Sequence, residues 1–283
     1  MAHPANHIRN FDKIRLKPWT LYVNKDFPGI SMAGLLPLSE QYDGVRGPFV
    51  EVRSSKFARV FKCSVGFVGC CHNLYLKQYL YRSTWDFIKH IFRRSRAKRA
   101  FAGSLALAEK GFCVPQIVAV GQRRYGPFCA ANFLITRALE DARDVYTCFG
   151  NNWTGQSPDV LRDKRRFIKA LGETIGRMHS VGIFHGDMRA GNVFAKKSEG
   201  NWQFFFLDNE RTKRFRRLPQ RLRLKNLVQI NMLRAKAIGN TDRMRFFESY
   251  IGQDTSIEHK YKKLAEKIIA KTRQRLGHSS PAG

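Results

Sequence analysis

Two acids and an amide are the side chains best suited to chemistry in this chain. Asp187 and Asn192 lie in the segment HGDMRAGN, and Asp208 follows sixteen residues after Asn192, in FLDNE. A loop aspartate can accept the proton of an attacking hydroxyl, while an amide oxygen and a second carboxylate are hard ligands that suit Mg²⁺. Phosphoryl transfer needs chiefly alignment and charge neutralisation. The three residues therefore predict phosphoryl transfer to a hydroxyl, with Asn192 and Asp208 holding the metal.

Two neighbours of the acid have expected supporting roles. Arg189 stands two residues after Asp187 and can offset charge that develops on the transferred group. His185 is expected to shape the loop through hydrogen bonds and not to shuttle protons. The competing interpretation is a pair of ordinary polar turns, because Asp and Asn favour turns. The order and spacing of the two motifs, after an amphipathic helix and around a strand hairpin, favour function.

A long helix should lead into the first motif. Residues 157–159 (Ser-Pro-Asp) have the signature of a helix start, and Gly182 is expected to end the helix. Between them the apolar residues keep helical spacing in one stripe: Phe167, Leu171, Ile175 and Met178. The strand WQFFFLDNE follows a turn at SEGN, then a basic helical region over about 218–238 and a C-terminal helix from about Ser256.

The preceding part of the chain has the pattern of a sheet with one helix. The run FVEVRSSKFARVFKCSV predicts two strands around a polar turn at residues 53–56, and LYLKQYLY predicts a third strand. A helix over about 95–110, closed by Gly111, precedes strands in CVPQIVAVG and NFLIT. We therefore expect an irregular lead-in over residues 1–48, a sheet lobe over 49–136 and a mainly helical lobe over 137–283.

This layout resembles the protein-kinase-like superfamily, and it is most similar to the bacterial lipopolysaccharide kinases, which phosphorylate Kdo or heptose sugars of the inner core. The resemblance runs from about residue 50 to 235, through VRSSKFARVFK, LYLKQY, SRAKRAF, NFLITRAL, HGDMRAGN and FLDNERTKR. It implies an α+β, bilobal protein-kinase-like fold with an N-terminal antiparallel sheet lobe and a mainly helical C-terminal lobe. It also implies an ATP- and Mg²⁺-dependent kinase acting on an inner-core sugar.

The resemblance assigns roles to individual residues. Lys77 would hold the α- and β-phosphates, and Ser54, Ser55 and Lys56 would form the nucleotide loop. Asp187 would be the catalytic base, and Asn192 and Asp208 would bind Mg²⁺.

The chain departs from the family pattern in two places. The two serines replace the usual glycines of the nucleotide loop, and Ala100 stands where a glutamate usually pairs with the lysine. The only acid further along that helix is Glu109, near its far end. A non-catalytic or weakly active pseudokinase is therefore an alternative.

Charge gives an independent indication of partners. The chain has 51 Lys+Arg against 22 Asp+Glu, a formal charge of +29. Eight of the cations fall within residues 211–225, and five within 93–99. Such blocks predict an anionic docking surface, which suits an anionic sugar or glycolipid acceptor and peripheral contact with an anionic inner-membrane surface. Binding of this kind should weaken as salt rises.

The remaining sequence features predict a cytoplasmic location, with the membrane contact on the cytoplasmic face of the inner membrane. The N-terminus lacks the apolar core of a signal peptide, and no apolar run reaches the ~18 residues of a membrane span. The six cysteines form no CxxC pair, which favours free thiols in a reducing compartment over a metal site.

Other function classes fit less well. A Ser/Thr protein kinase should have a long activation segment and an APE-like sequence, which are missing after Asp208. An antibiotic or choline-type phosphotransferase shares HGDxxxxN but should have an acidic pocket for a cationic substrate. A nucleic-acid-binding protein would explain the charge, yet no helix-turn-helix, zinc-finger or RNP-type sequence is present, so no specific nucleic acid is expected. The sequence leaves the oligomeric state open.

Overall fold

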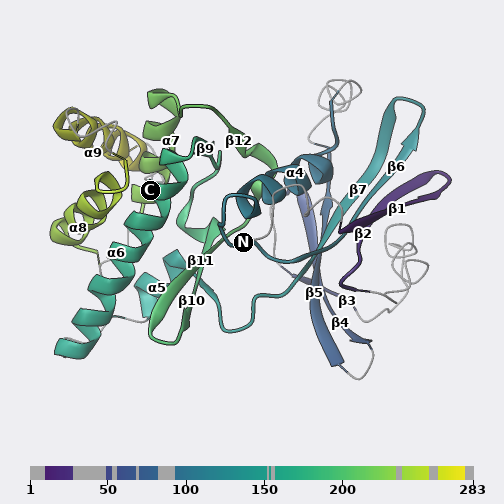
Figure 1. Cartoon of the computed structure of the whole chain (residues 1–283), viewed down its shortest axis with the longest axis horizontal. Helices are drawn as coiled ribbons and strands as arrows, with labels where there is room; N and C mark the ends of the chain where they lie inside the picture. Colours follow the sequence, from purple (N-terminus) through teal and green to yellow (C-terminus); the bar gives the residue numbers. More distant parts are fainter. Residues whose placement is uncertain are drawn as a thin grey trace. The chain divides into compact units, whose positions relative to one another are not determined.

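The chain folds into two compact units in a computed structural model (Figure 1). The structure describes residues 10–27, 49–52, 56–67, 70–81, 93–151, 153, 157–233, 238–254 and 261–277. The first unit comprises Met1–Leu105 and Pro115–Glu140, and the second comprises Ala106–Val114 and Asp141–Gly283.

The first unit is a seven-stranded antiparallel sheet in the order β1-β2-β6-β7-β5-β4-β3. One face packs on α4, where Ala97, Ala100 and Phe101 meet Val120 and other apolar residues in one cluster. The opposite face buries a second cluster that includes Leu74 and Leu76, as the alternation of β5 requires. The bounds are β1 Phe11–Leu16, β2 Trp19–Asn24, β3 Phe49–Val52, β4 Ala58–Phe67, β5 Cys70–Tyr79, α4 Arg96–Ala108, β6 Ile117–Tyr125 and β7 Phe128–Arg137.

The irregular lead-in expected over residues 1–48 is wrong for its described part. Strands β1 and β2 form a hairpin, and β2 pairs along its length with β6. Trp19 and Leu21 are buried in the sheet core, and the Asn24 side chain donates to the Ile117 carbonyl at 2.8 Å. β1 is an edge strand whose charged residues are exposed, so its sequence has little of the alternation that marks a strand.

The second unit is mainly helical around two small sheets, β11-β10-β8 and β12-β9. Helix α6 begins as predicted, with the Ser157 hydroxyl accepting from the Val160 amide at 3.4 Å. Helices α5 and α8 were not anticipated from the sequence. The bounds are β8 Arg143–Asp144, α5 Val145–Asn151, α6 Pro158–Ser180, β9 Ile183–Phe184, β10 Val193–Ser198, β11 Asn201–Phe206, β12 Lys213–Arg214, α7 Gln220–Asn231, α8 Asn240–Ile251 and α9 Tyr261–Gly277.

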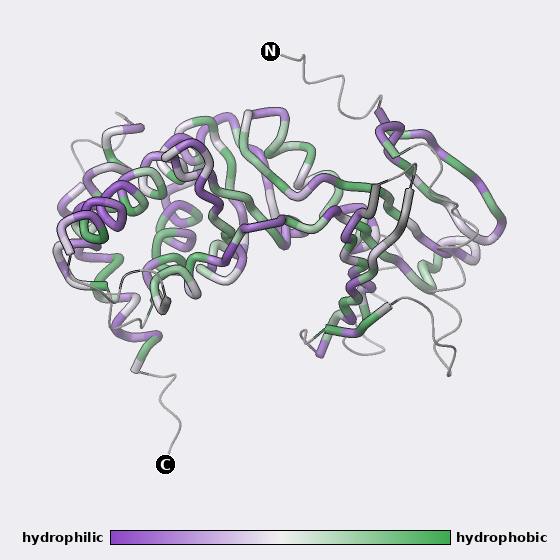
Figure 2. Tube along the Cα trace, turned by 90° about the horizontal axis from the view of Figure 1, so that it is seen from below, coloured by the Kyte–Doolittle hydropathy of each residue, from purple (hydrophilic) through white to green (hydrophobic). Residues whose placement is uncertain are grey.

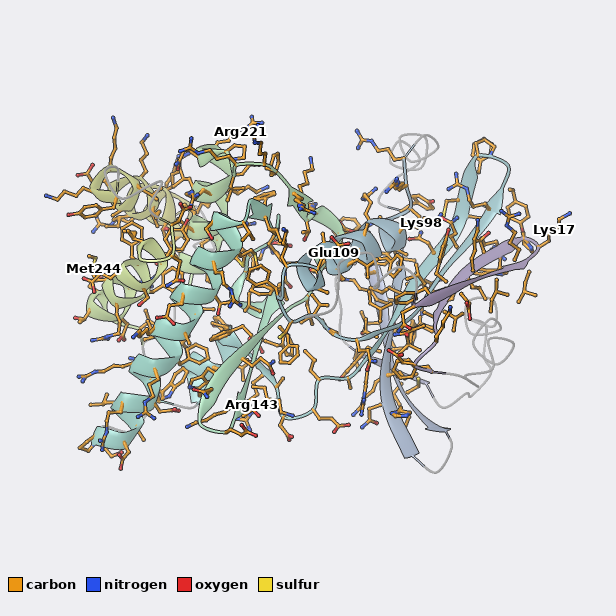
Figure 3. All side chains as sticks on the ribbon, viewed as in Figure 1. Lys17, Lys98, Glu109, Arg143, Arg221 and Met244 are labelled. Atoms are coloured by element: carbon orange, nitrogen blue, oxygen red, sulfur yellow. The ribbon has the colours of Figure 1, made fainter. Side chains whose placement is uncertain are left out.

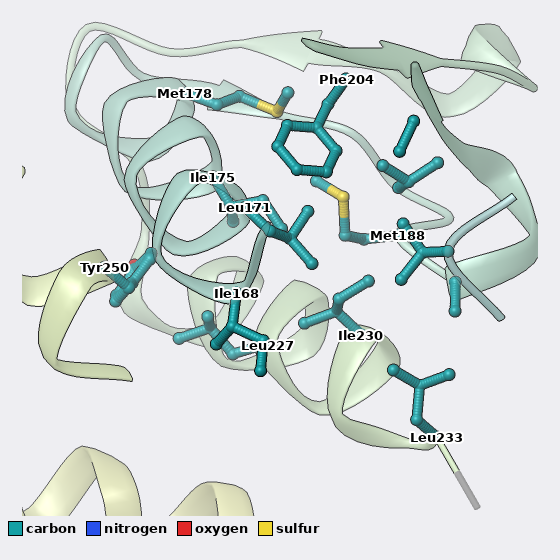
Figure 4. Packing of buried hydrophobic residues seen from close by; sticks show 14 of the residues in the cluster. Ile168, Leu171, Ile175, Met178, Met188, Phe204, Leu227, Ile230, Leu233 and Tyr250 are labelled. Atoms are coloured by element: carbon teal, nitrogen blue, oxygen red, sulfur yellow. The ribbon is translucent and has the colours of Figure 1, made fainter. Parts of the chain in front are cut away.

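The core of the second unit confirms the predicted apolar stripe of α6. Leu171, Ile175 and Met178 point from α6 toward side chains of α7 and β11, with Leu227 and Ile230 opposite (Figure 4). Along the trace, hydrophobic and hydrophilic residues alternate within most elements, so each has one face available for packing (Figure 2). Within the described residues, no helix has the length and apolar character needed to cross a bilayer.

Candidate active site

The HGDMRAGN segment forms a loop between two strands of the second unit. It leaves β9 at Phe184 and ends in a single 3-10 turn, Ala190–Asn192, before β10. Met188 in its middle has no exposed surface and points into the core among α6 and α7 side chains (Figure 4). Burying this side chain anchors the loop and so holds its polar neighbours in place.

Asp187 lies at the surface of this loop with its carboxylate in contact with two donors. The side chain is 21% exposed, and Arg189 Nε lies 2.9 Å from its Oδ1. Gln229 Nε2 lies 3.5 Å from the same oxygen. The backbone amide of Asp187 donates to His185 Nδ1 at 3.3 Å. The acid is therefore oriented, yet reachable from solvent, as a base for an incoming hydroxyl must be.

The structure brings the other two predicted residues to the same loop. Asn192 Nδ2 donates to the Asp187 carbonyl at 3.0 Å. The Asn192 carbonyl in turn accepts from the Leu207 amide at 2.9 Å, which places Asp208 at the next position. Asp208 has a left-handed backbone (φ 61) that turns the chain sharply after β11. Hydrogen bonds thus link the amide and both acid segments into one constellation within the second unit.

The donor set fits a magnesium ion. The Asn192 amide nitrogen is committed to the Asp187 carbonyl, so its side-chain oxygen is the atom left to ligate. No cluster of three or more His, Cys, Asp or Glu suited to a metal occurs in the described part of the chain. Mg²⁺ is usually held by one or two protein carboxylates together with substrate phosphates and water. Asn192 and Asp208 match that sparse arrangement.

Helix α7 supplies two supports of the loop that sequence reasoning missed. Gln229 accepts from the Met188 amide at 3.2 Å, and Asn226 accepts from the His185 amide at 3.3 Å. The two side chains also bond to each other at 3.2 Å. Both are buried, and their spacing of three residues on a helix is the only signal that the sequence offers.

Substitutions of Gln229 test how the candidate base, Asp187, is held. Gln229→Glu keeps an acceptor for the Met188 amide but sets a second carboxylate beside Asp187. Like charges at this distance disfavour the ionised acid, so we expect the acidic limb of the pH–rate profile to move to higher pH by roughly one unit. Gln229→Met is the uncharged comparison and should lower kcat without that displacement. Profiles that coincide for wild type and Gln229→Glu would contradict this role.

Behind these supports lies a buried polar cluster. His179 of α6 contacts the Tyr250 hydroxyl at 2.9 Å through Nδ1 and Asn226 Oδ1 at 3.2 Å through Nε2. Arg223 donates to the Tyr250 hydroxyl and reaches Asp254 Oδ2 at 2.6 Å. The cluster joins α6, α7 and the end of α8 to the residues that hold the HGDMRAGN loop.

This cluster makes stability depend on pH. Burial, with a smaller contribution from the Arg223 charge, lowers the pKa of His179 to about 3. Burial also lowers the pKa of His185, opposed by the charge of Asp187. Below the pKa of about 6.5 that histidine has in the unfolded chain, the unfolded chain binds protons that the folded chain does not bind. Stability should therefore fall by about 1.4 kcal/mol per pH unit for His179 as pH drops from 6.5 toward 3.

Urea unfolding at pH 7, 6 and 5 checks this expectation. His179→Gln keeps hydrogen-bonding groups for Tyr250 and Asn226 but cannot titrate. The unfolding free energy of this variant should therefore vary less steeply with pH than that of wild type, by the contribution of about one proton, ~1.4 kcal/mol per pH unit. Equal slopes for wild type and variant would show that His179 does not control the acid sensitivity.

In the first unit, Lys77 lies on β5 opposite Val60 and Leu134. Its ammonium group is 5.4 Å from the centre of the Tyr79 ring, on the face that carries α4. Lys56 is exposed just before β4, while the predicted partners Ser54 and Ser55 lie outside the described residues. Lys77 therefore occupies a central strand of the sheet, as a lysine that holds nucleotide phosphates would.

The departure at Ala100 is visible in the structure. Ala100 is buried in the apolar cluster between α4 and the sheet, so that position offers no carboxylate. Glu109, at the end of α4 (Figure 3), has its carboxylate 3.8 Å from Arg214 Nη1, both within the second unit. The glutamate that the resemblance led us to expect at this position is thus replaced by a buried, packed alanine.

One family of known proteins is similar to this chain over more than half of its length. The profile of the lipopolysaccharide kinase (Kdo/WaaP) family matches residues 52–250. The lipopolysaccharide core heptose(I) kinase WaaP of Pseudomonas aeruginosa is 26% identical over 160 residues, which are 54% of this chain and 59% of that protein. The chain thus matches less than two thirds of that relative's length.

A solved structure shows the same fold. The structure of WaaP in complex with acyl carrier protein superposes with a TM-score of 0.58 at 18% identity, covering 88% of this chain and 95% of the other. This match confirms the predicted protein-kinase-like fold, with its antiparallel sheet and helical parts.

Proposed function

The chain belongs to the lipopolysaccharide kinase (Kdo/WaaP) family, and we propose that it transfers the γ-phosphate of ATP to a sugar hydroxyl of the lipopolysaccharide inner core. The observation that carries the proposal is the hydrogen-bonded loop in which Asn192 fixes the Asp187 backbone and the Asp208 segment together. Family membership supplies the substrate class.

Each residue of the constellation has a role in this proposal. Asp187 accepts the proton of the attacking hydroxyl, held in position by Gln229 and by Arg189, whose guanidinium offsets charge on the transferred group. Asn192 and Asp208 would hold Mg²⁺, which neutralises phosphate charge when bound. Lys77, with Lys56, Ser54 and Ser55, would contact the nucleotide phosphates.

The acceptor sugar is either a heptose or Kdo. The relative named as a heptose(I) kinase supports heptose as the first acceptor to test. Specificity of this kind depends on contacts to the substrate hydroxyls, which discriminate strongly only where buried polar groups would lose their partners.

The direct test is incubation of the purified chain with γ-labelled ATP, Mg²⁺ and two acceptors, heptose-containing core and Kdo-terminated core. We expect label to appear in one acceptor, in a Mg²⁺-dependent manner. Binding of Mg·ATP, seen as a thermal shift, without transfer to either acceptor would favour the pseudokinase alternative. Transfer to casein or another protein substrate in place of the sugar would favour the protein-kinase alternative.

The proposed location is the cytoplasm, with peripheral contact at the anionic face of the inner membrane. The support is the surplus of cations in this chain, 51 Lys+Arg against 22 Asp+Glu. Co-sedimentation with vesicles that contain phosphatidylglycerol should decrease between about 0.05 and 0.5 M salt. Binding that is unchanged by salt, or equal on uncharged vesicles, would oppose this contact.

An acyl carrier protein is a further proposed partner, suggested by the complex in which the solved relative was captured. Co-elution of this chain with purified carrier protein in size-exclusion chromatography tests the proposal. Separate elution of the carrier protein, with and without an acyl chain, would reject it.

A further inference from the structure

A short run of cations lies directly beside the candidate base. The basic strand, residues 211–217, contains β12 and carries five exposed cations: Arg211, Lys213, Arg214, Arg216 and Arg217. It is the first segment after the Asp208 turn. Its position relative to Asp187 is set by main-chain pairing within the second unit.

The basic strand is held against the strand and loop that lead to Asp187. Lys213 and Arg214 pair with Phe184 and Ile183 of β9. The Phe215 amide donates to the Gly182 carbonyl at 2.8 Å, and the Thr212 hydroxyl donates to the His185 carbonyl at 3.2 Å. These bonds fix the backbone, so its side chains project from a rigid support.

Two glycines allow this close approach. A Cβ at Gly186 would lie 2.5 Å from the Arg211 Cβ, and one at Gly182 would lie 2.0 Å from the Phe215 carbonyl oxygen. Both glycines also have positive φ, at +88° and +79°. Because Gly186 immediately precedes Asp187, the row of cations begins next to the candidate base.

Most of this charge is not neutralised by acids. Arg211 and Arg214 lie 3.8 Å from Glu210 and Glu109, which is too long for a direct hydrogen bond. Among the residues that the structure describes, no carboxylate comes within ion-pair distance of Lys213, Arg216 or Arg217. Cations on a fixed backbone beside a candidate reaction centre are suited to hold an anionic substrate, because the backbone need not be ordered on binding.

We propose that the basic strand is the subsite for the phosphate or carboxylate groups of the acceptor, placed so that a neighbouring hydroxyl reaches Asp187. The proposal rests on the proposed kinase function and deepens it. Guanidinium groups bind carboxylates and phosphates in a bidentate manner, so they orient the acceptor as well as attract it.

The test removes two cations through Arg211→Gln and Lys213→Gln together, called here the β12 double variant; Arg211 ends the 3-10 turn Asn209–Arg211 and Lys213 begins β12. The matched control is Arg165→Gln with Arg166→Gln, two exposed cations on α6 of the same unit. On water-soluble core oligosaccharide, the β12 double variant should raise the acceptor KM roughly tenfold and leave the ATP KM unchanged. The α6 control should leave both KM values unchanged.

A second arm asks which groups are recognised. The second acceptor is core oligosaccharide stripped of phosphate and methyl-esterified at its carboxylates. With the wild-type enzyme its KM should be roughly tenfold higher than that of the native oligosaccharide. With the β12 double variant the native and neutralised oligosaccharides should have the same KM. Calorimetric binding of the native and neutralised oligosaccharides gives the same comparison without turnover, so absence of transfer would reject the kinase function and leave the subsite testable.

Three outcomes would overturn the subsite. The first is an acceptor KM that changes equally in the β12 and α6 variants. The second is an equal loss on native and neutralised acceptor. The third is lost binding to phosphatidylglycerol vesicles with unchanged affinity for the soluble oligosaccharide, which would assign the basic strand to lipid headgroups.

Discussion

Asp187→Asn should lower kcat for transfer to the sugar by about 10²–10⁴-fold, the range expected for loss of a general base. The amide is isosteric and can still contact Arg189 and Gln229, which lie 2.9 and 3.5 Å from the Asp187 Oδ1. What it loses is the ability to take a proton from the attacking hydroxyl. The KM for ATP should change little, because the phosphates are held elsewhere.

The matched control for this variant is Asp163→Asn on α6. Asp163 has a similar side-chain exposure, 25% against 21%, and a similar cationic partner, Lys197 at 2.7 Å. Steady-state kinetics with both variants separates proton transfer from the general effect of removing a paired carboxylate. Equal activities for Asp187→Asn and wild type would remove Asp187 from its role as base.

The candidate site could be proposed from sequence because its residues are close along the chain. Asp187, Asn192 and Asp208 fall within 22 residues, after a helix whose cap and apolar stripe are plain. Local signals of this kind, a capped helix and a hairpin, depend on few distant contacts. The structure joins Asp187 and Asn192 by a hydrogen bond and places Asp208 next to Leu207, whose amide donates to the Asn192 carbonyl; the sequence did not specify these bonds.

The supports of the loop could not be predicted because they come from a distant helix. Asn226 and Gln229 sit in a basic, polar stretch that reads as a solvated helix. The same stretch holds Arg223, which belongs to the block expected to form a docking surface. The structure corrects that expectation for this residue, since Arg223 is 2% exposed and paired with Asp254. Which polar residues turn inward depends on long-range packing, and composition does not reveal it.

The cations of residues 211–225 differ in exposure according to their position in the fold. Residues 211–217 are in the basic strand and Arg221 extends from the start of α7 (Figure 3), whereas Arg223 faces the buried cluster. A helical period of 3.6 residues carries the chain from exposed to buried within one turn. A run of charges in the sequence therefore predicts the sign of a surface, and the structure is needed to show which of its residues are exposed.

Asp208→Asn should lower activity nearly as much as loss of the base does, because it weakens the binding of the metal. Its carboxylate is the only charged ligand in the proposed Mg²⁺ pair, so replacing it with an amide removes one unit of negative charge from the cation's surroundings. A metal ion contributes several kcal/mol of charge stabilisation, so kcat/KM for Mg·ATP should fall by roughly 10²–10³-fold. Raised Mg²⁺ should restore part of the loss, because the defect is in affinity.

Asp141→Asn provides an unusually close control for this variant. Asp141 and Asp208 both have left-handed backbones, with φ of 58° and 61°, and asparagine tolerates that conformation as well as aspartate does. The two substitutions therefore make the same covalent change in the same backbone conformation. Mn²⁺ binding in the presence of ATP, followed by electron paramagnetic resonance, should weaken for Asp208→Asn alone. Equal Mn²⁺ affinity in both variants would place the metal on other ligands, because the two variants lose the same charge in the same backbone conformation.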